Sequence, residues 1–301
     1  MKLINQSAQY LPQQAGIDGI YKQIELAGRT SYLSWDKMTD DSAKKFVDML
    51  IKSKHTSVLE HGTIYLKIQT DSFSIGKYHH EGTILTSQFE VNSYSKVHYD
   101  DAEVAYITTN YRSLLEYFDE DDVEFMLRKY LCEPTEFHEK RLSVKVITDI
   151  GVTREFNRHR TFSIVEQSTR YCNFSKDKFG NEITFIKPYW YDSMKDIPIN
   201  DEWNVVDEFI ASLEGNEETY NLLIRKGLQP QQVRQVLPLS TKTEVVYTAF
   251  ESDWRHFFDL RLFGKTGEPH PDMLVLANLI KQEFEKAGVW EGIIKYPSKY
   301  E

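Results

Sequence analysis

The chain has 301 residues, of which 41% are hydrophobic and 27% charged, and these proportions exclude extensive disorder. The formal net charge of −10 argues against a general nucleic-acid binder, which usually presents a basic surface. No apolar run is long enough to span a bilayer, no apolar signal core marks the amino-terminal residues, and two cysteines cannot build a disulfide scaffold or a four-cysteine metal site. We therefore expect a cytoplasmic protein with no membrane association, no nucleic-acid partner and no metal.

The first half of the chain alternates between helical and strand patterns. Residues 41–54 place apolar side chains on one face of a helix, and residues 62–70 alternate as a strand does. Residues 71–100 show no clear period, and two short helical patterns follow between residues 109 and 131. Residues 142–151 predict a second strand, and the spacing over residues 154–172 favours a helix with unevenly placed apolar positions.

The second half is predicted to be mainly helical. Helical periodicity covers residues 202–226, 252–263 and 272–288, and Gly288 suits the end of the last helix. Pro230 suits the first turn of a short helix that Pro238 ends, and residues 244–250 are rich in strand formers. No repeat or linker divides the chain. We expect an α/β protein: one mixed α+β domain over residues 1–301, with a central sheet flanked by helices and an insertion at about residues 70–140.

The densest group of chemically useful side chains follows the second predicted strand. Residues 158–160 read Arg-His-Arg, and adjacent cations repel one another unless an anion lies nearby. Four arginines fall between residues 154 and 170, and a guanidinium group forms forked hydrogen bonds to phosphate or carboxylate. Ser168 and Arg170 are suited to hold a phosphate, and Glu166 can accept hydrogen bonds from an amide-like ring or a sugar hydroxyl. This pattern predicts a site for a small anionic ligand.

The same residues resemble a known family. Arg-His-Arg, then seven residues, then serine is the signature of flavin-dependent thymidylate synthases, and here it reads Arg158-His159-Arg160 and Ser168. Tyr171 occupies its family place, as do the glutamate and arginine named above. The match of several fixed positions in one short window makes this the most specific signal in the chain.

Other segments resemble the family as well. The family's His-x-x-x-x-Glu-His segment reads His55 to His61, and Arg29–Ser31 resembles its flavin-contacting Arg-Thr-Ser. Arg234 precedes Leu-Pro-Leu where the family has a nucleotide-binding arginine, and Arg261 stands where an arginine faces the uracil ring. His270 resembles a histidine near the flavin.

The resemblance implies reductive methylation of dUMP to dTMP, with methylenetetrahydrofolate as carbon donor and NADPH-reduced FAD as hydride source. It also implies a homotetramer with FAD at the subunit contacts. The implied dUMP-binding residues are Glu155, Phe156, Asn157, Arg158, Glu166, Gln167, Ser168, Thr169, Arg170, Arg234 and Arg261. The implied FAD-binding residues are Ser31, Ser57, Glu60, Arg158, His159, Arg160, Glu166, Ser252, His256 and His270.

Arg261 is the predicted catalytic residue. A guanidinium group against the uracil N3–C4 amide would stabilise the negative charge that makes the ring a carbon nucleophile. Neither Cys132 nor Cys172 lies in a motif of a nucleophilic cysteine, and Ser168 has no adjacent base at a clear spacing. We therefore expect no covalent protein–nucleotide intermediate.

The chain also departs from the family pattern. Val165 and His256 stand where the family often has asparagine, and Glu155 stands where it often has glutamine. The family's Asn-x-Arg flavin contact falls at Phe250–Ser252, where only backbone or hydroxyl contacts remain. Each departure removes or changes one polar contact with the flavin or the nucleotide.

Simpler interpretations stay open for single residues and for the chain. His55, Glu60 and His61 also suit a helix cap and a turn, arginines on amphipathic helices commonly form surface ion pairs, and Cys172 suits a small buried position. Two alternatives remain for the function: a diverged NADPH oxidase that binds flavin and nucleotide, and a non-enzymatic nucleotide- or RNA-binding protein.

Overall fold

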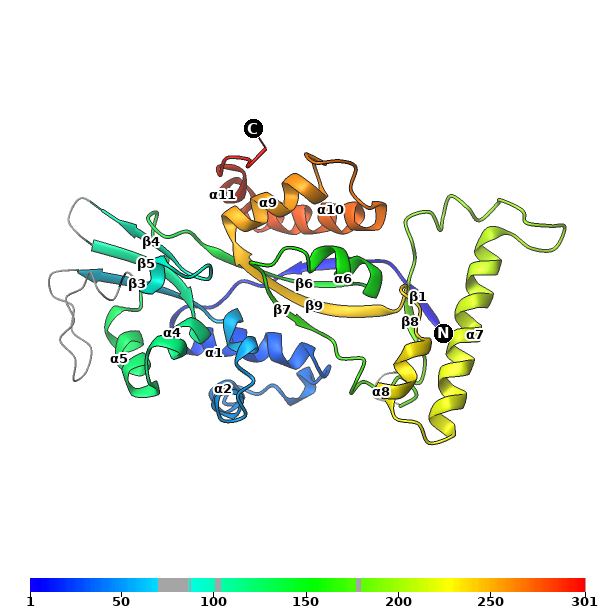
Figure 1. The fold of residues 1–301 in the computed structure, drawn as a ribbon, viewed down its shortest axis with the longest axis horizontal. Helices are drawn as coiled ribbons and strands as arrows, with labels where there is room; N and C mark the ends of the chain where they lie inside the picture. Colours follow the sequence, from blue (N-terminus) through cyan, green and yellow to red (C-terminus); the bar gives the residue numbers. More distant parts are fainter. Residues whose placement is uncertain (70–85, 87, 101–103, 177–179, 301) are drawn as a thin grey trace.

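A four-stranded antiparallel sheet forms the centre of the computed structural model, which describes residues 1–301 except 70–85, 87, 101–103, 177–179 and 301 (Figure 1). In spatial order the strands are β2 (Ser7–Tyr10), β6 (Arg141–Asp149), β9 (Lys242–Phe250) and β7 (Ser163–Glu166). Val144 lies opposite Tyr247 in the long β6–β9 pair. Both long strands are mostly buried, so helices must cover both faces of this sheet.

One face of the central sheet carries an extensive apolar cluster. Leu142, Val144 and Val146 alternate along β6 and pack with Val245 and Tyr247 of β9. The helices above this face in Figure 1 are α6 (Ile150–Phe156), α9 (Glu251–Arg261), α10 (Pro271–Lys286) and α11 (Trp290–Ile294). Asp149 caps α6 by accepting a hydrogen bond from the Val152 N–H at 2.7 Å, which ends the strand and starts the helix.

The opposite face carries smaller and more polar side chains. Ser143 and Thr248 share a 2.7 Å hydrogen bond, and Val246 packs with Ala27 of the covering helix. The elements on this side, drawn below the sheet in Figure 1, are α1 (Gly16–Thr30), η1 (Trp35–Lys37), α2 (Ser42–Lys52) and η2 (Thr56–His61).

A second sheet continues from η2 and has its own apolar cluster. Its antiparallel order is β3 (Thr63–Gln69), β5 (Val104–Asn110) and β4 (Lys96–Tyr99), followed in the chain by α4 (Tyr111–Tyr117) and α5 (Glu120–Tyr130). Ile64, Leu66 and Ile68 alternate along β3 and pack against Ile107 of β5 and against α1. The predicted insertion at 70–140 lies partly outside the described residues, and its described part packs into this cluster.

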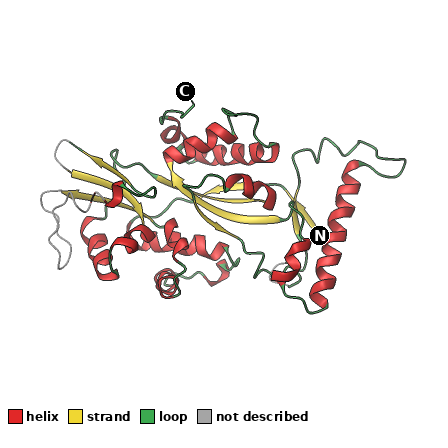
Figure 2. Cartoon of the chain, viewed as in Figure 1, coloured by secondary structure: helices red, strands yellow, loops and turns green. Residues whose placement is uncertain are grey.

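A third, smaller cluster lies at the other end of the molecule. Its elements are the parallel strands β1 (Lys2–Ile4) and β8 (Thr184–Ile186), with α7 (Val205–Arg225), α8 (Pro230–Val233) and η4 (Arg234–Val236). Figure 2 shows the long helix α7 standing to the side of the sheet. Asn204 and Asp207 form a capping box that fixes its beginning.

Most predicted elements are confirmed, and one is wrong. Helices over 41–54, 202–226, 252–263 and 272–288 appear as α2, α7, α9 and α10, and the predicted strands appear as β3, β6 and β9. The helix predicted over residues 154–172 is wrong, because α6 ends at Phe156 and residues 163–166 form β7. The run Ser-Ile-Val-Glu is a strand because it pairs with β9. The spacing of apolar residues along the chain could not reveal this pairing.

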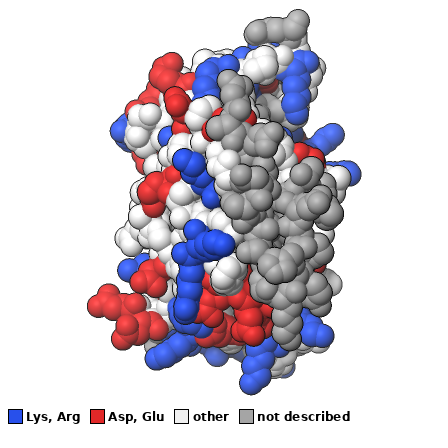
Figure 3. Space-filling model, turned by 90° about the vertical axis from the view of Figure 1, so that its left-hand side faces the viewer, with Lys and Arg blue, Asp and Glu red and all other residues white. Residues whose placement is uncertain are grey.

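The surface that can be seen is of mixed charge. On the end of the molecule shown in Figure 3, basic and acidic side chains lie interspersed over the part that is not grey. Within the described residues, no helix combines the length and apolar character needed to cross a membrane.

Candidate functional site

The loop after β7 binds to the end of α1. The N–H of Ser168 donates to the carbonyl of Ser31 at 2.9 Å, and the Ser168 hydroxyl accepts from the N–H of Arg170 at 3.2 Å. The rings of Tyr32 and Tyr171 lie 5.3 Å apart beside this contact. The predicted flavin-contacting segment at Arg29–Ser31 and the predicted phosphate-binding loop are therefore direct neighbours.

Two exposed guanidinium groups flank this loop. Arg170 donates through Nε to Gln231 Oε1 at 3.1 Å, and Arg234 donates through Nη1 to Thr169 Oγ1 at 3.4 Å. Neither arginine forms an ion pair with another described residue. Two uncompensated cations beside Ser168 form an arrangement suited to a phosphate group.

Glu166 and Gln167 lie at the edge of the same loop. Glu166 Oε1 accepts from the hydroxyl of Thr243 at 3.0 Å, and burial raises the pKa of this carboxyl group. The side chain of Gln167 accepts from Lys242 Nζ at 3.2 Å, and its N–H donates to the carbonyl of Glu244 at 2.8 Å. We call these residues, with Ser31 and the loop, the Ser168 cluster: Ser31, Glu166, Gln167, Ser168, Thr169, Arg170 and Arg234.

A second group surrounds Arg261. Its Nη1 donates to Glu155 Oε2 and its Nη2 to the Glu155 carbonyl, both at 3.0 Å, while its Nε donates to His159 Nε2 at 3.2 Å. All three guanidinium nitrogens are thus engaged within the chain, and the orientation of the group is fixed. The catalytic arginine predicted from the sequence is held by two other predicted site residues.

His159 is a neutral hydrogen-bond acceptor in this group. Its ring is 5% exposed and packs between the rings of Phe162, Phe257 and His256. Burial, followed by the positive charge of Arg261, lowers the pKa of His159 to about 3. A neutral imidazole can accept the hydrogen bond from Arg261, which an imidazolium could not.

The remaining predicted residues of this segment divide between core and surface. Phe156 is fully buried and stacks on Tyr247 with ring centroids 3.6 Å apart, so its side chain is part of the core. The Tyr247 hydroxyl also donates to Asn157 Oδ1 at 3.0 Å. Arg158 and Arg160 are exposed on either side of buried His159. We call this group the His159 cluster: Glu155, Phe156, Asn157, Arg158, His159, Arg160, His256 and Arg261.

Three predicted flavin contacts lie along the helices above the central sheet. His256, on α9, is 5.7 Å from the ring of His159 and stacks on Tyr300 at 5.8 Å. The N–H of Ser252 donates to Glu139 Oε1 at 2.9 Å, at the beginning of α9, and exposed His270 directly precedes α10. Of these three, the described contacts join only His256 to the His159 cluster.

The two clusters lie at opposite ends of one strand. β7 begins at Ser163, next to the His159 cluster, and ends at Glu166 in the Ser168 cluster. Its three residue steps separate the ends by about 10 Å. No described contact joins Arg261 to Ser168, the two residues predicted to bind one nucleotide.

A cavity of about 610 Å³ lies between α1, α2 and η2, and we call it the α1–α2 cavity. Ser31 and Ser57, both predicted to contact flavin, line it together with His55, Phe46 and other residues. Glu60 lies at the end of the same segment and forms an ion pair with Arg112 at 2.6 Å. Through Ser31 the cavity adjoins the Ser168 cluster. Its size is in the range of small-molecule and cofactor sites.

A comparison with protein families shows to which family the chain belongs. The family described as thymidylate synthase complementing protein matches residues 17–103 and 123–287. The chain belongs to this family. The matched segments contain both clusters and the family signature, while residues 104–122, with β5 and α4, lie between them.

Several curated proteins are similar to this member of the family. It is 28% identical over 148 residues to a protein of Paramecium bursaria Chlorella virus 1 named "Probable flavin-dependent thymidylate synthase". This alignment covers 48% of this chain and 66% of the relative. It is 29% identical to the flavin-dependent thymidylate synthase of Thermosipho africanus, over 51% of this chain and 70% of the relative. It is 31% identical to the flavin-dependent thymidylate synthase of Pyrococcus furiosus, over 36% of this chain and 41% of the relative. The chain thus spans less than two thirds of the first and third relatives.

One solved structure that resembles the chain is that of the UMP/dUMP methylase PolB from Streptomyces cacaoi, bound with 5-Br dUMP. The two chains superpose with a TM-score of 0.45 at 16% sequence identity, over 98% of this chain and 96% of the other. A likeness at this level carries no conclusion about the activity of this family member.

Sequence reasoning did not assign Arg141 any role, and it placed His61 in the family segment without expecting it to join that segment to the central sheet. Arg141 is 6% exposed and donates to the Glu60 carbonyl at 2.8 Å and to Ser163 Oγ at 2.9 Å. His61 is fully buried, its Nδ1 is 2.8 Å from the Thr248 hydroxyl, and burial lowers its pKa to about 3. Both residues join the predicted flavin segment at η2 to the central sheet. Only the polar character of Arg141 at the start of an apolar strand hinted at such a role.

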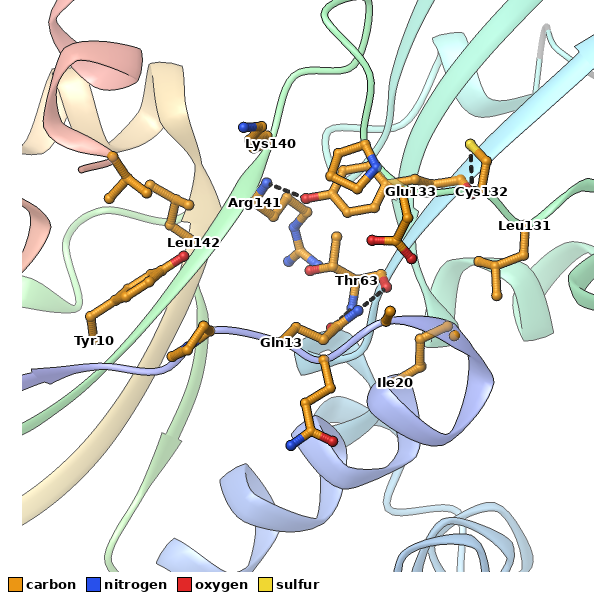
Figure 4. Close-up of a pocket in the computed structure, with 17 residues that line it drawn as sticks. Tyr10, Gln13, Ile20, Thr63, Leu131, Cys132, Glu133, Lys140, Arg141 and Leu142 are labelled. Atoms are coloured by element: carbon orange, nitrogen blue, oxygen red, sulfur yellow. Dashed lines mark hydrogen bonds between the residues drawn. The ribbon is translucent and has the colours of Figure 1, made fainter. Parts of the chain in front are cut away.

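Arg141 also lines a second cavity, of about 210 Å³ (Figure 4). Tyr10, Thr63, Glu133 and Lys140 line it, and Gln13 exchanges two hydrogen bonds with Thr63, at 2.7 and 2.8 Å. None of the predicted flavin or nucleotide residues lines this cavity, so it is separate from both clusters.

Proposed function

We propose that the protein is a flavin-dependent thymidylate synthase that methylates dUMP to dTMP. Methylenetetrahydrofolate would be the carbon donor, and FAD, reduced by NADPH, would supply the hydride. The observation that carries the proposal is the Ser31–Ser168 hydrogen bond. It joins a cofactor-sized cavity lined by predicted flavin contacts to a loop with two guanidinium groups that form no ion pair with another described residue. The names of the curated relatives and the family membership support the same activity.

The α1–α2 cavity fits the adenosine diphosphate and flavin parts of such a cofactor in chemical character. Ser31 and Ser57 supply hydroxyl groups, while Phe46 and other apolar side chains supply flat, dry contact area. The bound flavin would supply hydride transfer. Positive charge near the flavin N1–C2 edge stabilises its reduced anion, and exposed Arg158 and Arg160 are suited to that task.

The nucleotide phosphate would bind at the Ser168 cluster. Ser168 offers a hydroxyl group, and Arg170 and Arg234 offer charge-assisted hydrogen bonds from two sides. Half-buried Glu166, on the edge toward β9, can accept a hydrogen bond from the uracil ring or from the sugar. This division leaves the phosphate at the surface and the base toward the sheet.

Arg261 would stabilise the negative charge that develops on the uracil ring. Glu155 and His159 fix the orientation of its guanidinium group before a substrate arrives, so little reorganisation is needed during the reaction. Because the His159 cluster lies at the other end of β7, we propose a homotetramer in which Arg261 of one chain meets the Ser168 cluster of another. FAD would then lie at the contact between subunits.

This arrangement requires no covalent bond between protein and nucleotide. Cys172 is 1% exposed, and burial raises the pKa of the other thiol, Cys132. The hydroxyl of Ser168 accepts a backbone hydrogen bond and has no imidazole or carboxylate partner among the described contacts. Neither thiol nor hydroxyl is activated as a nucleophile. The cytoplasmic location stays a prediction from the sequence.

The test is the visible absorbance spectrum of the purified protein supplied with FAD, recorded before and after NADPH and with and without dUMP. The proposal predicts an oxidised-flavin spectrum that NADPH bleaches at a rate that dUMP changes. Bleaching indifferent to dUMP would instead identify a diverged flavin oxidase. No flavin binding would refute the proposal, and a colourless protein with salt-dependent RNA affinity would identify the non-enzymatic alternative.

A further inference from the structure

Helix α4, which the family comparison does not cover, begins against the flavin segment. Asn110 at the end of β5 lies opposite Thr63 of β3, and the N–H of Tyr111 donates to the Gly62 carbonyl at 3.0 Å. Asn110 also caps α4 by accepting from the N–H of Ser113 at 3.0 Å. The second residue of this helix, Arg112, therefore stands beside η2, and its side chain lines the α1–α2 cavity.

Two carboxylates orient Arg112 without using all its donors. Nη1 donates to Glu60 Oε1 at 2.6 Å, and Nε donates to Glu116 Oε1 at 2.9 Å. Nη2 donates to no other residue in the described part of the chain, and the side chain is 37% exposed. The guanidinium group is thus held in place at the cavity with a terminal N–H₂ group available to a ligand.

The charge of the α1–α2 cavity contrasts with that of the whole chain. Its lining includes Lys54 and Arg112, and no aspartate or glutamate is among the described residues that line it, although Glu60 and Glu116 pair with Arg112 from outside the lining. The chain as a whole has a net charge of −10. A partly apolar cavity with Lys54 and the free N–H₂ group of Arg112 in its lining fits a ligand with an aromatic ring and a phosphate group.

We propose that Arg112 is a cofactor-binding residue that contacts the diphosphate of the flavin dinucleotide. The inference rests on the proposed function, because it takes FAD as the occupant of this cavity. It assigns a role to α4, within the described part of the stretch at about 70–140, for which the family signature offers none. A guanidinium group held by two carboxylates presents its remaining donors in a fixed fork, which suits a diphosphate better than a mobile lysine.

The experiment compares flavin binding by the wild-type protein with binding by Arg112→Met and Arg112→Lys, using FAD and riboflavin as probes. Riboflavin lacks the diphosphate. Arg112→Met should weaken FAD binding about 10- to 100-fold and leave riboflavin binding unchanged, and Arg112→Lys should recover part of the FAD affinity. Arg128→Met is the matched control, because Arg128 on α5 is 72% exposed and pairs only with Glu124 of its own helix among the described contacts. It should bind FAD as the wild type does.

Each other outcome has a definite meaning. Equal losses for FAD and riboflavin would show that Arg112 acts only by holding Glu60, and unchanged FAD affinity would show no role in binding; either result overturns the inference. If Arg112→Met does not fold, the FAD affinity of Arg112→Lys tests the inference instead. A lysine variant that binds FAD as tightly as the wild type would contradict it, because lysine lacks the fixed fork of donors. A wild-type protein that binds no flavin refutes the proposed function itself, a result distinct from all of these.

Discussion

Replacing His61 by asparagine should make the protein less sensitive to acid. His61 is fully buried and its pKa is about 3, whereas an imidazole in the unfolded chain has a pKa near 6.5. Below pH 6.5 the unfolded chain therefore binds a proton that the folded protein excludes. The stability that this residue contributes is complete above pH 6.5 and is lost as the pH falls toward 3. Between pH 7 and pH 5 the loss amounts to about 2 kcal/mol.

The assay is urea denaturation of wild type and His61→Asn at pH 7, 6 and 5. The asparagine amide can replace the Nδ1 contact to Thr248 but carries no titratable group, so the variant is expected to be less stable at pH 7. The difference in unfolding free energy should shrink by about 2 kcal/mol at pH 5. His159 and the carboxylates are common to both proteins and cancel. His55→Asn, at an exposed position of the same segment, is the control. A difference that stays constant with pH would refute the assignment of His61 as a buried neutral imidazole.

Three further substitutions test the site and its support. Ser168→Ala should weaken dUMP binding about tenfold and leave turnover, whereas complete loss of chemistry with intact binding would contradict a non-covalent role. Glu155→Gln should lower kcat/KM about threefold by loosening Arg261, and an unchanged kcat/KM would exclude this positioning role. Arg141→Met leaves a buried carbonyl and hydroxyl unpaired and should lower the unfolding free energy by about 2–4 kcal/mol; an unaltered Tm in thermal denaturation would speak against it.

Elements with a long, regular hydrophobic period could be predicted from the sequence. The helices α2, α7 and α10 each bury one face, and β3 and β6 alternate over several residues, so local spacing determines their type. β7 could not be predicted in this way, because four residues give too short a period and pairing with β9 decides its conformation. The two-stranded β1–β8 sheet depends likewise on segments about 180 residues apart.

In the candidate site, too, residues of a local motif could be predicted, whereas contacts between distant segments could not. Ser168, Arg170 and His159 could be proposed as site residues because they belong to one short motif, and the structure places the two parts of this motif at the two ends of β7. Arg112 lies 52 residues from its partner Glu60, and the register between β3 and β5 brings the two together. No local pattern encodes such a contact, so only the fold could show it.

The separation of the two clusters along β7 has a consequence for mass action. Under the proposed assembly, a dissociated chain would carry two half-sites and no complete nucleotide site, so turnover per chain would depend on total protein concentration. Such a protein is regulated by its own abundance: below the concentration at which subunits associate, it would bind ligands weakly at each half and convert none of them.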